Sequence, residues 1–313
     1  MNKFIRYWNQ NRLIIIIILI IIVLVIALIQ TVNYLLGNIN EPVIQAEEKI
    51  PDLSSPTESV LSGEEVPEEN SQENANAIKQ FVDYCNSGSY QNAYDLLSQE
   101  CKEELFSNLD VFIQDYVNEI FDTNKSYTLE LWFSTAQEFT YRILYINDDI
   151  LSSGTVNINN NKEDYITVVK EDEGYKLNIS NFIYREEINK SNNASNIEIT
   201  INDSNKFRSY EVYNITVRNS SDKTILLSSG SNGNDICLTD TNNVEYDSII
   251  NEIPQIGLEL APGAQKTFDI RFYKMYNLYR EIDRITFKNI ILDKESYEND
   301  PNNAETARIT IYI

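Results

Sequence analysis

The hydrophobic pattern changes several times along the chain, and each change predicts a different kind of structure. Residues 13–29 form an apolar run without charge, glycine or proline, and residues 30–36 continue it less strictly. As a helix rising about 1.5 Å per residue, the run alone covers about 26 Å, close to the thickness of a bilayer core. The pattern therefore predicts a transmembrane helix over residues 13–36.

The charges on either side of this run predict an orientation. Residues 1–12 carry three basic side chains and no acidic one, whereas acidic residues follow the run. Because positive charge stays on the cytoplasmic side, residues 1–12 are predicted to form a cytoplasmic tip, with the C-terminal domains outside the cell. A cleaved signal peptide is the alternative, but its apolar region would be shorter and followed closely by small residues.

Residues 37–73 lose aromatic side chains and are rich in Glu, Ser, Pro and Asn. Such a segment cannot bury an apolar core and repels itself, which predicts a disordered acidic linker.

A helical pattern and then a strand pattern follow. Residues 76–85 place apolar side chains at helical spacing, and two further amphipathic stretches continue to about residue 121. From residue 127 the pattern alternates in runs near 127–133, 139–146, 150–159, 164–170 and 175–179. Helices followed by an antiparallel sheet predict an α+β domain over residues 74–185.

From residue 195 short alternating runs recur, separated by polar turns. This spacing predicts an all-β sandwich over residues 195–313. The predicted fold class is thus a membrane-anchored multi-domain protein: a single N-terminal transmembrane helix, an α+β domain, and an all-β sandwich.

Composition narrows the function. The formal net charge of −23 argues against binding nucleic acid, and the chain contains no histidine. Ser-His-Asp and Cys-His nucleophiles and His-containing zinc sites are therefore excluded, and the chain is expected to be non-catalytic, with no cofactor and no metal site. Cys85 and Cys101 either pair or stay buried free thiols, and free thiols are favoured because spacing alone does not show that the two residues lie close together.

Two segments carry a resemblance in the α+β region. Residues 88–98 (GSYQNAYDLLS) and residues 168–177 (VVKEDEGYKL) resemble the nuclear-transport-factor-two-like superfamily, whose fold is a cystatin-like cone. The superfamily includes enzymes, ligand binders and membrane-tethered assembly subunits. Its enzymes use an Asp with His or Tyr inside the cone. This chain lacks His, and its strand pattern places no acid clearly inward beside a Tyr.

The C-terminal region carries a second resemblance. Residues 213–223 (YNITVRNSSDK) and 260–263 (LAPG), with Phe268, are similar to immunoglobulin-like domains of Gram-positive surface proteins. The resemblance implies a structural or adhesive role, and abundant Asn, Ile and Tyr fit a Gram-positive bacterium with an AT-rich genome.

Two groups of side chains are candidate contacts for a ligand or partner. One is a basic and aromatic stretch in an acidic chain, and the other lies at the predicted mouth of the cone. An ordinary strand end with a loop, and ordinary sheet core, are the favoured explanations. The candidates are Arg271, Tyr273, Lys274, Tyr276, Tyr279 and Arg280, and, at the cone, Trp132 and Tyr141.

The sequence therefore predicts a single-pass protein of the cell membrane that displays extracytoplasmic binding or assembly modules. Its expected partners are the lipid bilayer, through the predicted helix, and a protein or a cell-wall polymer. The alternatives are a small-ligand-binding or hydrolytic cone, a conjugation or secretion channel subunit, and a cell-wall adhesion or sensing protein.

Overall fold

The structure, a computed structural model, describes residues 59–60, 68–135, 138–147, 161–171, 174–229, 235–249, 258–277 and 280–313. All of these belong to one compact unit, Ser55–Ile313. Within this unit the buried apolar side chains gather in two cores.

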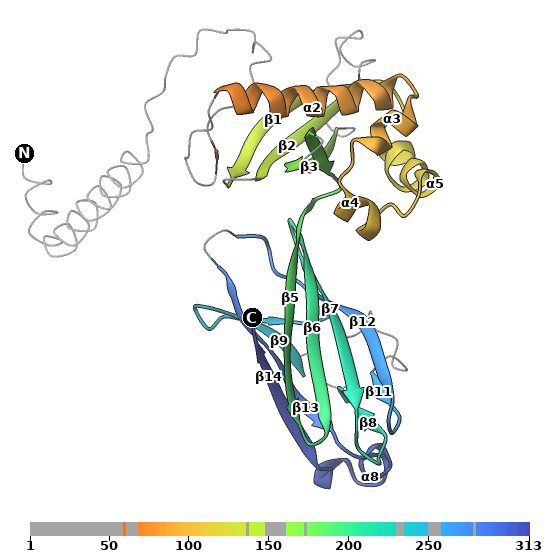
Figure 1. The fold of residues 1–313 in the computed structure, drawn as a ribbon, viewed down its shortest axis with the longest axis vertical. Helices are drawn as coiled ribbons and strands as arrows, with labels where there is room; N and C mark the ends of the chain where they lie inside the picture. Colours follow the sequence, from red (N-terminus) through yellow and green to blue (C-terminus); the bar gives the residue numbers. More distant parts are fainter. Residues whose placement is uncertain are drawn as a thin grey trace, which may run out of the picture. The chain divides into compact units, whose positions relative to one another are not determined.

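The first core lies beneath helix α2 (Glu68–Asn86), which crosses one face of a sheet (Figure 1). Ile78, Phe81, Val82 and Cys85 are almost completely buried, as their helical spacing predicts. Short helical pieces follow, and they are α3 (Tyr90–Asp95), α4 (Gln99–Glu104), α5 (Leu109–Phe112), the π-helical η1 (Ile113–Val117) and α6 (Asn118–Ile120). Two of them, α4 and α5, begin at a side-chain cap, Ser98 and Asn108, that accepts a backbone N–H.

The sheet of the first core is antiparallel, in the order β1-β2-β3-β4. Its strands are β1 (Lys125–Ser134), β2 (Glu138–Asn147), β3 (Lys162–Glu171) and β4 (Gly174–Asn178). Alternate side chains such as Leu131, Tyr141 and Ile143 enter the core, as the period of two requires.

The second core is enclosed by two further sheets. One has the order β12-β7-β6-β5, and the other has the order β10-β9-β13-β8-β11 with β14 paired to β13. The first is built from β5 (Phe182–Ala194), β6 (Ile197–Phe207), β7 (Glu211–Asn219) and β12 (Gln265–Phe272). The second is built from β8 (Ile225–Leu226), β9 (Ile236–Asp240), β10 (Glu245–Asp247), β11 (Glu259–Leu260), β13 (Ile282–Ile291) and β14 (Thr306–Tyr312). The helices α8 (Lys294–Asn299) and η5 (Pro301–Asn303) connect β13 to β14.

Strands β5 and β6 belong to both cores and lie side by side (Figure 1). Phe182 and Phe207 pack in the first core with ring centroids 5.3 Å apart, whereas Ile188 and Ile199 pack in the second. The gap predicted between the two domains, residues 186–194, therefore lies inside a strand. The hydrophobic pattern did not predict this strand, because β5 is an edge strand whose second half is mostly exposed and polar.

The fold class predicted from the sequence is wrong. The described chain is mostly β-sheet with few helices, and none of the described helices is long and apolar enough to cross a membrane. The longest, α2, has 19 residues, but its exposed face is polar and charged. The membrane and transmembrane assignments are corrected accordingly. The segments on which they rested, residues 1–12 and 13–36, lie outside the described residues.

Helix α2 also begins within the predicted linker, at Glu68. Its early turns bury small polar side chains instead of apolar ones. Ser71 and Asn74 are fully buried, and Asn74 Nδ2 donates to the Tyr141 hydroxyl at 3.1 Å. Hydrophobic periodicity carries no signal for such a start.

The cysteines are free thiols, and Cys85, Cys101 and Cys237 are all buried. Burial raises the pKa of Cys101 to about 12, so this thiol is a small apolar core group and not a nucleophile.

Candidate functional site

A cavity of about 500 Å³ opens where the two cores meet, and we call it the junction cavity. Its walls come from the connection between β1 and β2, from β5, β6 and β7, from the loop after β12, and from the start of β13. The lining residues are Thr135, Glu138, Tyr184, Glu186, Lys206, Glu211, Lys274, Tyr276, Asn277, Arg280, Glu281, Ile282 and Ile313.

Strand alternation decides which side chains of β5 and β6 reach the cavity. Tyr184 pairs with Lys206, and both line it. The next pair along, Arg185 and Asn205, points to the opposite face of the sheet, since neighbouring residues of a strand alternate. One hairpin thus supplies a cavity wall on one face and a contact surface on the other.

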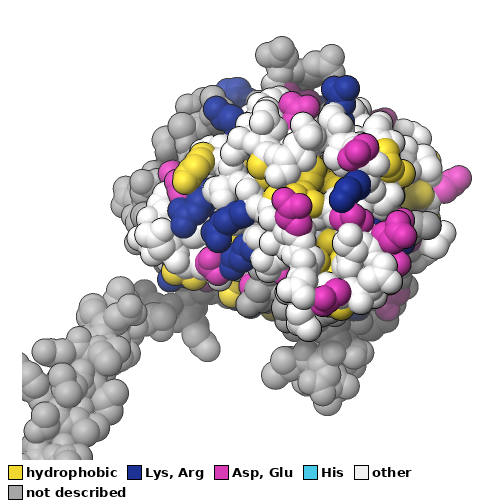
Figure 2. All heavy atoms as spheres, turned by 90° about the horizontal axis from the view of Figure 1, so that it is seen from below, with side chains coloured by type: hydrophobic (Ala, Val, Ile, Leu, Met, Phe, Trp, Pro, Cys, Tyr) yellow, Lys and Arg dark blue, Asp and Glu magenta, His cyan; other side chains and the backbone are white. Residues whose placement is uncertain are grey.

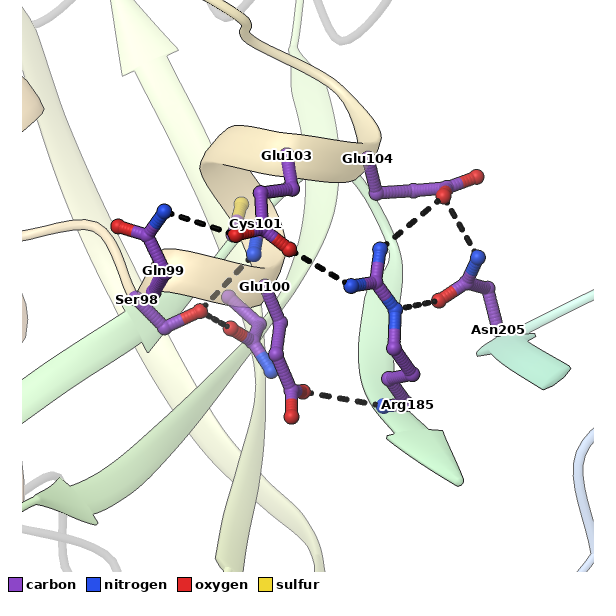
Figure 3. A network of polar contacts seen from close by, with 9 residues as sticks. Ser98, Gln99, Glu100, Cys101, Glu103, Glu104, Arg185 and Asn205 are labelled. Atoms are coloured by element: carbon purple, nitrogen blue, oxygen red, sulfur yellow. Dashed lines mark hydrogen bonds and ion pairs between the residues drawn. The ribbon is translucent and has the colours of Figure 1, made fainter. Parts of the chain in front are cut away.

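That contact surface fixes the hairpin to helix α4 (Figure 3). Arg185 donates from Nη1 to Glu103 Oε2 at 2.8 Å and from Nε to Asn205 Oδ1 at 2.9 Å. Asn205 Nδ2 donates to Glu104 Oε2 at 2.6 Å, and the Arg185 backbone N–H donates to Glu100 Oε2 at 3.1 Å. These bonds hold the cavity wall against the helices of the first core.

The innermost part of the junction cavity is a buried charged cluster. Glu211 Oε1 accepts from Lys274 Nζ at 2.5 Å, and Glu211 Oε2 accepts from Lys206 Nζ at 2.8 Å and from the Tyr213 hydroxyl at 2.7 Å. The Glu211, Lys274 and Lys206 side chains are only 1%, 4% and 7% exposed. Burial acts to raise the pKa of Glu211, but the charges and hydrogen bonds of the two lysines outweigh it and hold that pKa below its usual range.

Two tyrosines form an aromatic wall of the cavity. The Tyr276 ring stacks on Phe133 with centroids 4.9 Å apart and meets the Tyr184 ring edge-on at 6.2 Å. Its backbone N–H donates to the Arg208 carbonyl at 2.9 Å. Burial and the nearby carboxylates raise the pKa of Tyr184 and of Tyr276, so both hydroxyls keep their protons.

Glu138 stands at the start of β2, on the lining of the cavity. Burial, reinforced by the charge of Glu100, raises the pKa of this carboxyl from 4.5 to about 7. It therefore exchanges its proton near neutral pH, unlike Glu211.

This raised pKa predicts a pH-dependent difference in stability. When the pKa of an acid is higher in the folded state than in the unfolded state, its contribution to the free energy of unfolding is complete at a pH below the unfolded-state pKa. That contribution is lost as the pH rises through the folded-state pKa. For Glu138 this window runs from 4.5 to about 7. Glu138→Gln is expected to be about 1–2 kcal/mol more stable than wild type at about pH 8, and equal to it at about pH 4, after allowing for partial solvent screening. Urea unfolding across this range measures it. The exposed Glu187→Gln is the control, and a pH-independent difference would contradict the expectation.

The structure separates the predicted basic and aromatic stretch into two faces. Lys274 and Tyr276 turn inward to the cavity, whereas Tyr273 and Met275 are 66% and 65% exposed. Arg280 is exposed and lines the cavity. Tyr279 lies outside the described residues.

The other predicted contacts lie apart from the cavity lining or form its support. The Arg271 guanidinium lies over the Tyr210 ring at 4.5 Å. Trp132 is half-buried beside the aromatic wall, 6.0 Å from Tyr276 between ring centroids. Tyr141 is fully buried in the first core, which matches the favoured explanation of ordinary sheet core.

Sequence reasoning missed Lys206 and Glu211, which form the centre of the cluster. The signal was present, because they are directly opposed across the β6–β7 hairpin with opposite charges. Glu138 and Tyr184 were missed because only the tertiary arrangement brings them to the same cavity.

A second buried acid corrects the expectation that no strand acid is inward with a Tyr partner. Asp164 of β3 is 2% exposed and accepts from the Tyr116 hydroxyl at 2.8 Å. It also accepts from the backbone N–H groups of Tyr165, Ser180 and Asn181 at 2.7, 3.0 and 2.8 Å. Its acceptor positions are thus used within the fold, and Asp164 supports a turn.

The charged side chains of the surface are distributed differently from those of the junction cavity. Figure 2 shows a face on which basic and acidic side chains are interspersed, with small apolar areas between them. That face offers mixed charge instead of a patch of one sign.

Comparison with known proteins gives little. No protein-family model and no curated protein matches the chain. Among solved structures, the chain is similar to a conserved hypothetical protein from Bacillus anthracis, at 15% identity over 32% of this chain and 95% of that one. The TM-score of that match is 0.23, so it carries no argument about fold or function.

Proposed function

We propose that this protein is a non-catalytic binding component that holds a small polar ligand in the junction cavity. The observation that carries the proposal is the cavity itself, about 500 Å³ in volume, with buried charged side chains in its lining. That volume is in the range of small-molecule sites, and a few fixed polar groups in such a site orient a ligand. The hairpin that forms its wall is held on its other face by Arg185, which supports a preformed site.

A variant that narrows the cavity tests the proposal. Asn277 is exposed and lines the cavity, so Asn277→Trp places an indole at the lining. This variant is expected to bind any ligand of the cavity with an affinity lower by about tenfold or more. Thermal-shift screening of a small-molecule panel, followed by calorimetry of each hit, measures this. Asn193→Trp, an exposed asparagine at the other end of β5, is the matched control. Hits that bind both variants as well as wild type would contradict the proposal.

A protein partner is a second candidate, and one observation favours it. Tyr273 and Met275 have large exposed side chains on the loop in which Lys274, Tyr276 and Asn277 line the cavity. Exposed Tyr and Met are typical of partner-contact surfaces. Cross-linking of the wild type and of the Tyr273→Ser, Met275→Ser variant separates this candidate from cavity binding, which that variant leaves intact.

The remaining predictions of function rest on sequence. The location outside the cell is suggested by the strongly acidic composition, and a cell-wall polymer stays a predicted partner. The resemblances to cone and immunoglobulin-like domains stay predictions as well.

A further inference from the structure

The lining of the junction cavity includes two chemically different groups, an ammonium and a carboxyl. The Lys274 ammonium is 4% exposed and donates to Glu211. An ammonium has three N–H donors, and this bond is the one that the described residues give Lys274. Two of its N–H donors thus have no acceptor among the described residues, and because Lys274 lines the cavity, a polar acceptor there would satisfy them.

Lys206 differs from Lys274, although both contact Glu211. Its ammonium donates to Glu211 at 2.8 Å and to the Tyr213 hydroxyl at 2.9 Å, and it lies 3.6 Å from a Glu186 oxygen. These three neighbours match its three N–H groups. The uncommitted donors of the cluster thus belong to Lys274.

The lining of the cavity also includes Glu138. In the described part of the chain, neither a side-chain hydrogen bond nor an ion pair joins this carboxyl to Lys206 or Lys274. Burial and the charge of Glu100 raise its pKa, and no lysine lowers it. Glu138 is therefore an acid of the lining that neither lysine neutralises.

Tyr184 and Tyr276 line the same cavity as Glu138 and Lys274, and their rings meet edge-on with centroids 6.2 Å apart. The charges of both Glu138 and Glu211 contribute to raising the pKa of each tyrosine, in agreement with this shared lining. Their rings offer faces to a cation, and their protonated hydroxyls can donate to an anion.

We propose that the junction cavity binds a zwitterion, a free amino acid or short peptide, with its carboxylate on Lys274 and its ammonium between Glu138 and the Tyr184 and Tyr276 rings. The inference rests on the proposed function, because it names the ligand class of the same cavity. A ligand with only one charge would leave either the buried Lys274 donors or the Glu138 carboxyl without a partner, which disfavours it. A cavity of about 500 Å³ has room for a molecule of this size.

The test uses the full chain and pairs of probes that differ by one charge. The zwitterions are the individual free L-amino acids and the dipeptide alanyl-alanine. For each hit, the N-acetylated form removes the ammonium and the amide form removes the carboxylate. Propionate, propylamine and neutral sugars complete the panel, and calorimetry measures each affinity.

At least one zwitterion is expected to bind, and either capped form of it is expected to bind at least about tenfold more weakly. Glu138→Gln is expected to weaken the zwitterion and its amide form, while leaving the N-acetylated form unchanged. Lys274→Gln is expected to weaken the zwitterion and its N-acetylated form, while leaving the amide form unchanged. In this variant Glu211 stays paired with Lys206, so the charges of the cluster remain balanced. The exposed Lys79→Gln and Glu187→Gln are the matched controls.

Three outcomes overturn the inference, and they are distinguishable. If a neutral sugar or a singly charged probe binds in the cavity, and Asn277→Trp blocks it while zwitterions do not bind, the ligand class is wrong and the proposed function stands. If no probe binds wild type, or if Asn277→Trp changes nothing, the proposed function fails with it. Zwitterion binding that is equal in Glu138→Gln, Lys274→Gln and wild type also overturns the assignment.

Discussion

Asp164→Ala is expected to lower the free energy of unfolding by about 3–4 kcal/mol. The carboxylate accepts four hydrogen bonds, three of them from backbone N–H groups. Ser180 and Asn181, which give two of these, have positive φ angles of 58° and 63°. A left-handed turn of non-glycine residues is strained, so it depends on the acceptor that holds its N–H groups. Alanine removes that acceptor from four donors, of which the Tyr116 hydroxyl and the Tyr165 N–H are buried and the other two are partly buried.

Related variants separate the hydrogen bonds from the charge. Burial raises the pKa of Asp164 despite the four hydrogen bonds, so a neutral acceptor is less costly there than the loss of the acceptor. Asp164→Asn is therefore expected to lose only about 1–2 kcal/mol. Asp115→Ala, an exposed aspartate beside Tyr116 on η1, is the matched control. Urea unfolding measures all three, and an Asp164→Ala variant as stable as Asp115→Ala would show that the turn does not need the carboxylate.

The sequence predicted elements better than it predicted their boundaries. The apolar residues of α2 at helical spacing are buried as expected, and the alternating runs near residues 127–133 and 139–146 are β1 and β2. These patterns succeed because each element buries one face against the core. The start of α2 and the second half of β5 were not predicted, because polar residues occupy them. Such predictions depend on apolar periodicity, which these residues lack.

The candidate site was predicted only in part, for a related reason. A stretch such as residues 271–280 shows which side chains are basic or aromatic, but not which way each points. In the structure Lys274 is 4% exposed and its neighbour Tyr273 is 66% exposed. Glu138, Tyr184 and Glu211 are separated by tens of residues, and the β5–β6 hairpin brings them together by passing between the cores. The pairing of the strands decides which of these distant residues meet, and the order of residues along the chain alone does not give that pairing.

Glu211→Gln is expected to produce the largest loss of stability among the residues of the junction cavity, about 3–5 kcal/mol in the free energy of unfolding. The carboxylate is the counter-charge of two ammonium groups that are 4% and 7% exposed. Glutamine keeps the shape but offers one acceptor oxygen, and its amide N–H groups then face a lysine. Lys206 then keeps only the half-exposed Glu186 carboxylate, 3.6 Å away, and Lys274 keeps no counter-charge among the described residues. This costs more than the hydrogen bonds alone, because the desolvation of the two buried cations is no longer offset.

The acid titration of the same cluster gives an independent check with a defined sign. The folded pKa of Glu211 lies below its unfolded value, so its contribution is complete above the usual Glu pKa and is lost as pH falls through the folded one. The difference in stability between wild type and Glu211→Gln is therefore expected to be large near neutral pH and to shrink on acidification. The difference in stability between wild type and Glu138→Gln also shrinks on acidification, but there the variant is the more stable protein. The sign of the difference therefore distinguishes the two acids of the cavity.

Removing the lysines together with the acid separates charge from packing. In the variant Lys206→Met, Glu211→Leu, Lys274→Met, no buried charge is left without a partner, and it is expected to recover most of the stability that Glu211→Gln loses. The exposed Glu198→Gln, on the neighbouring strand β6, is the control. If the triple variant is stable but no longer binds small polar molecules, the cluster is retained for binding and not for the fold. If it is no more stable than Glu211→Gln, shape and not charge balance sets the cost of changing this cluster.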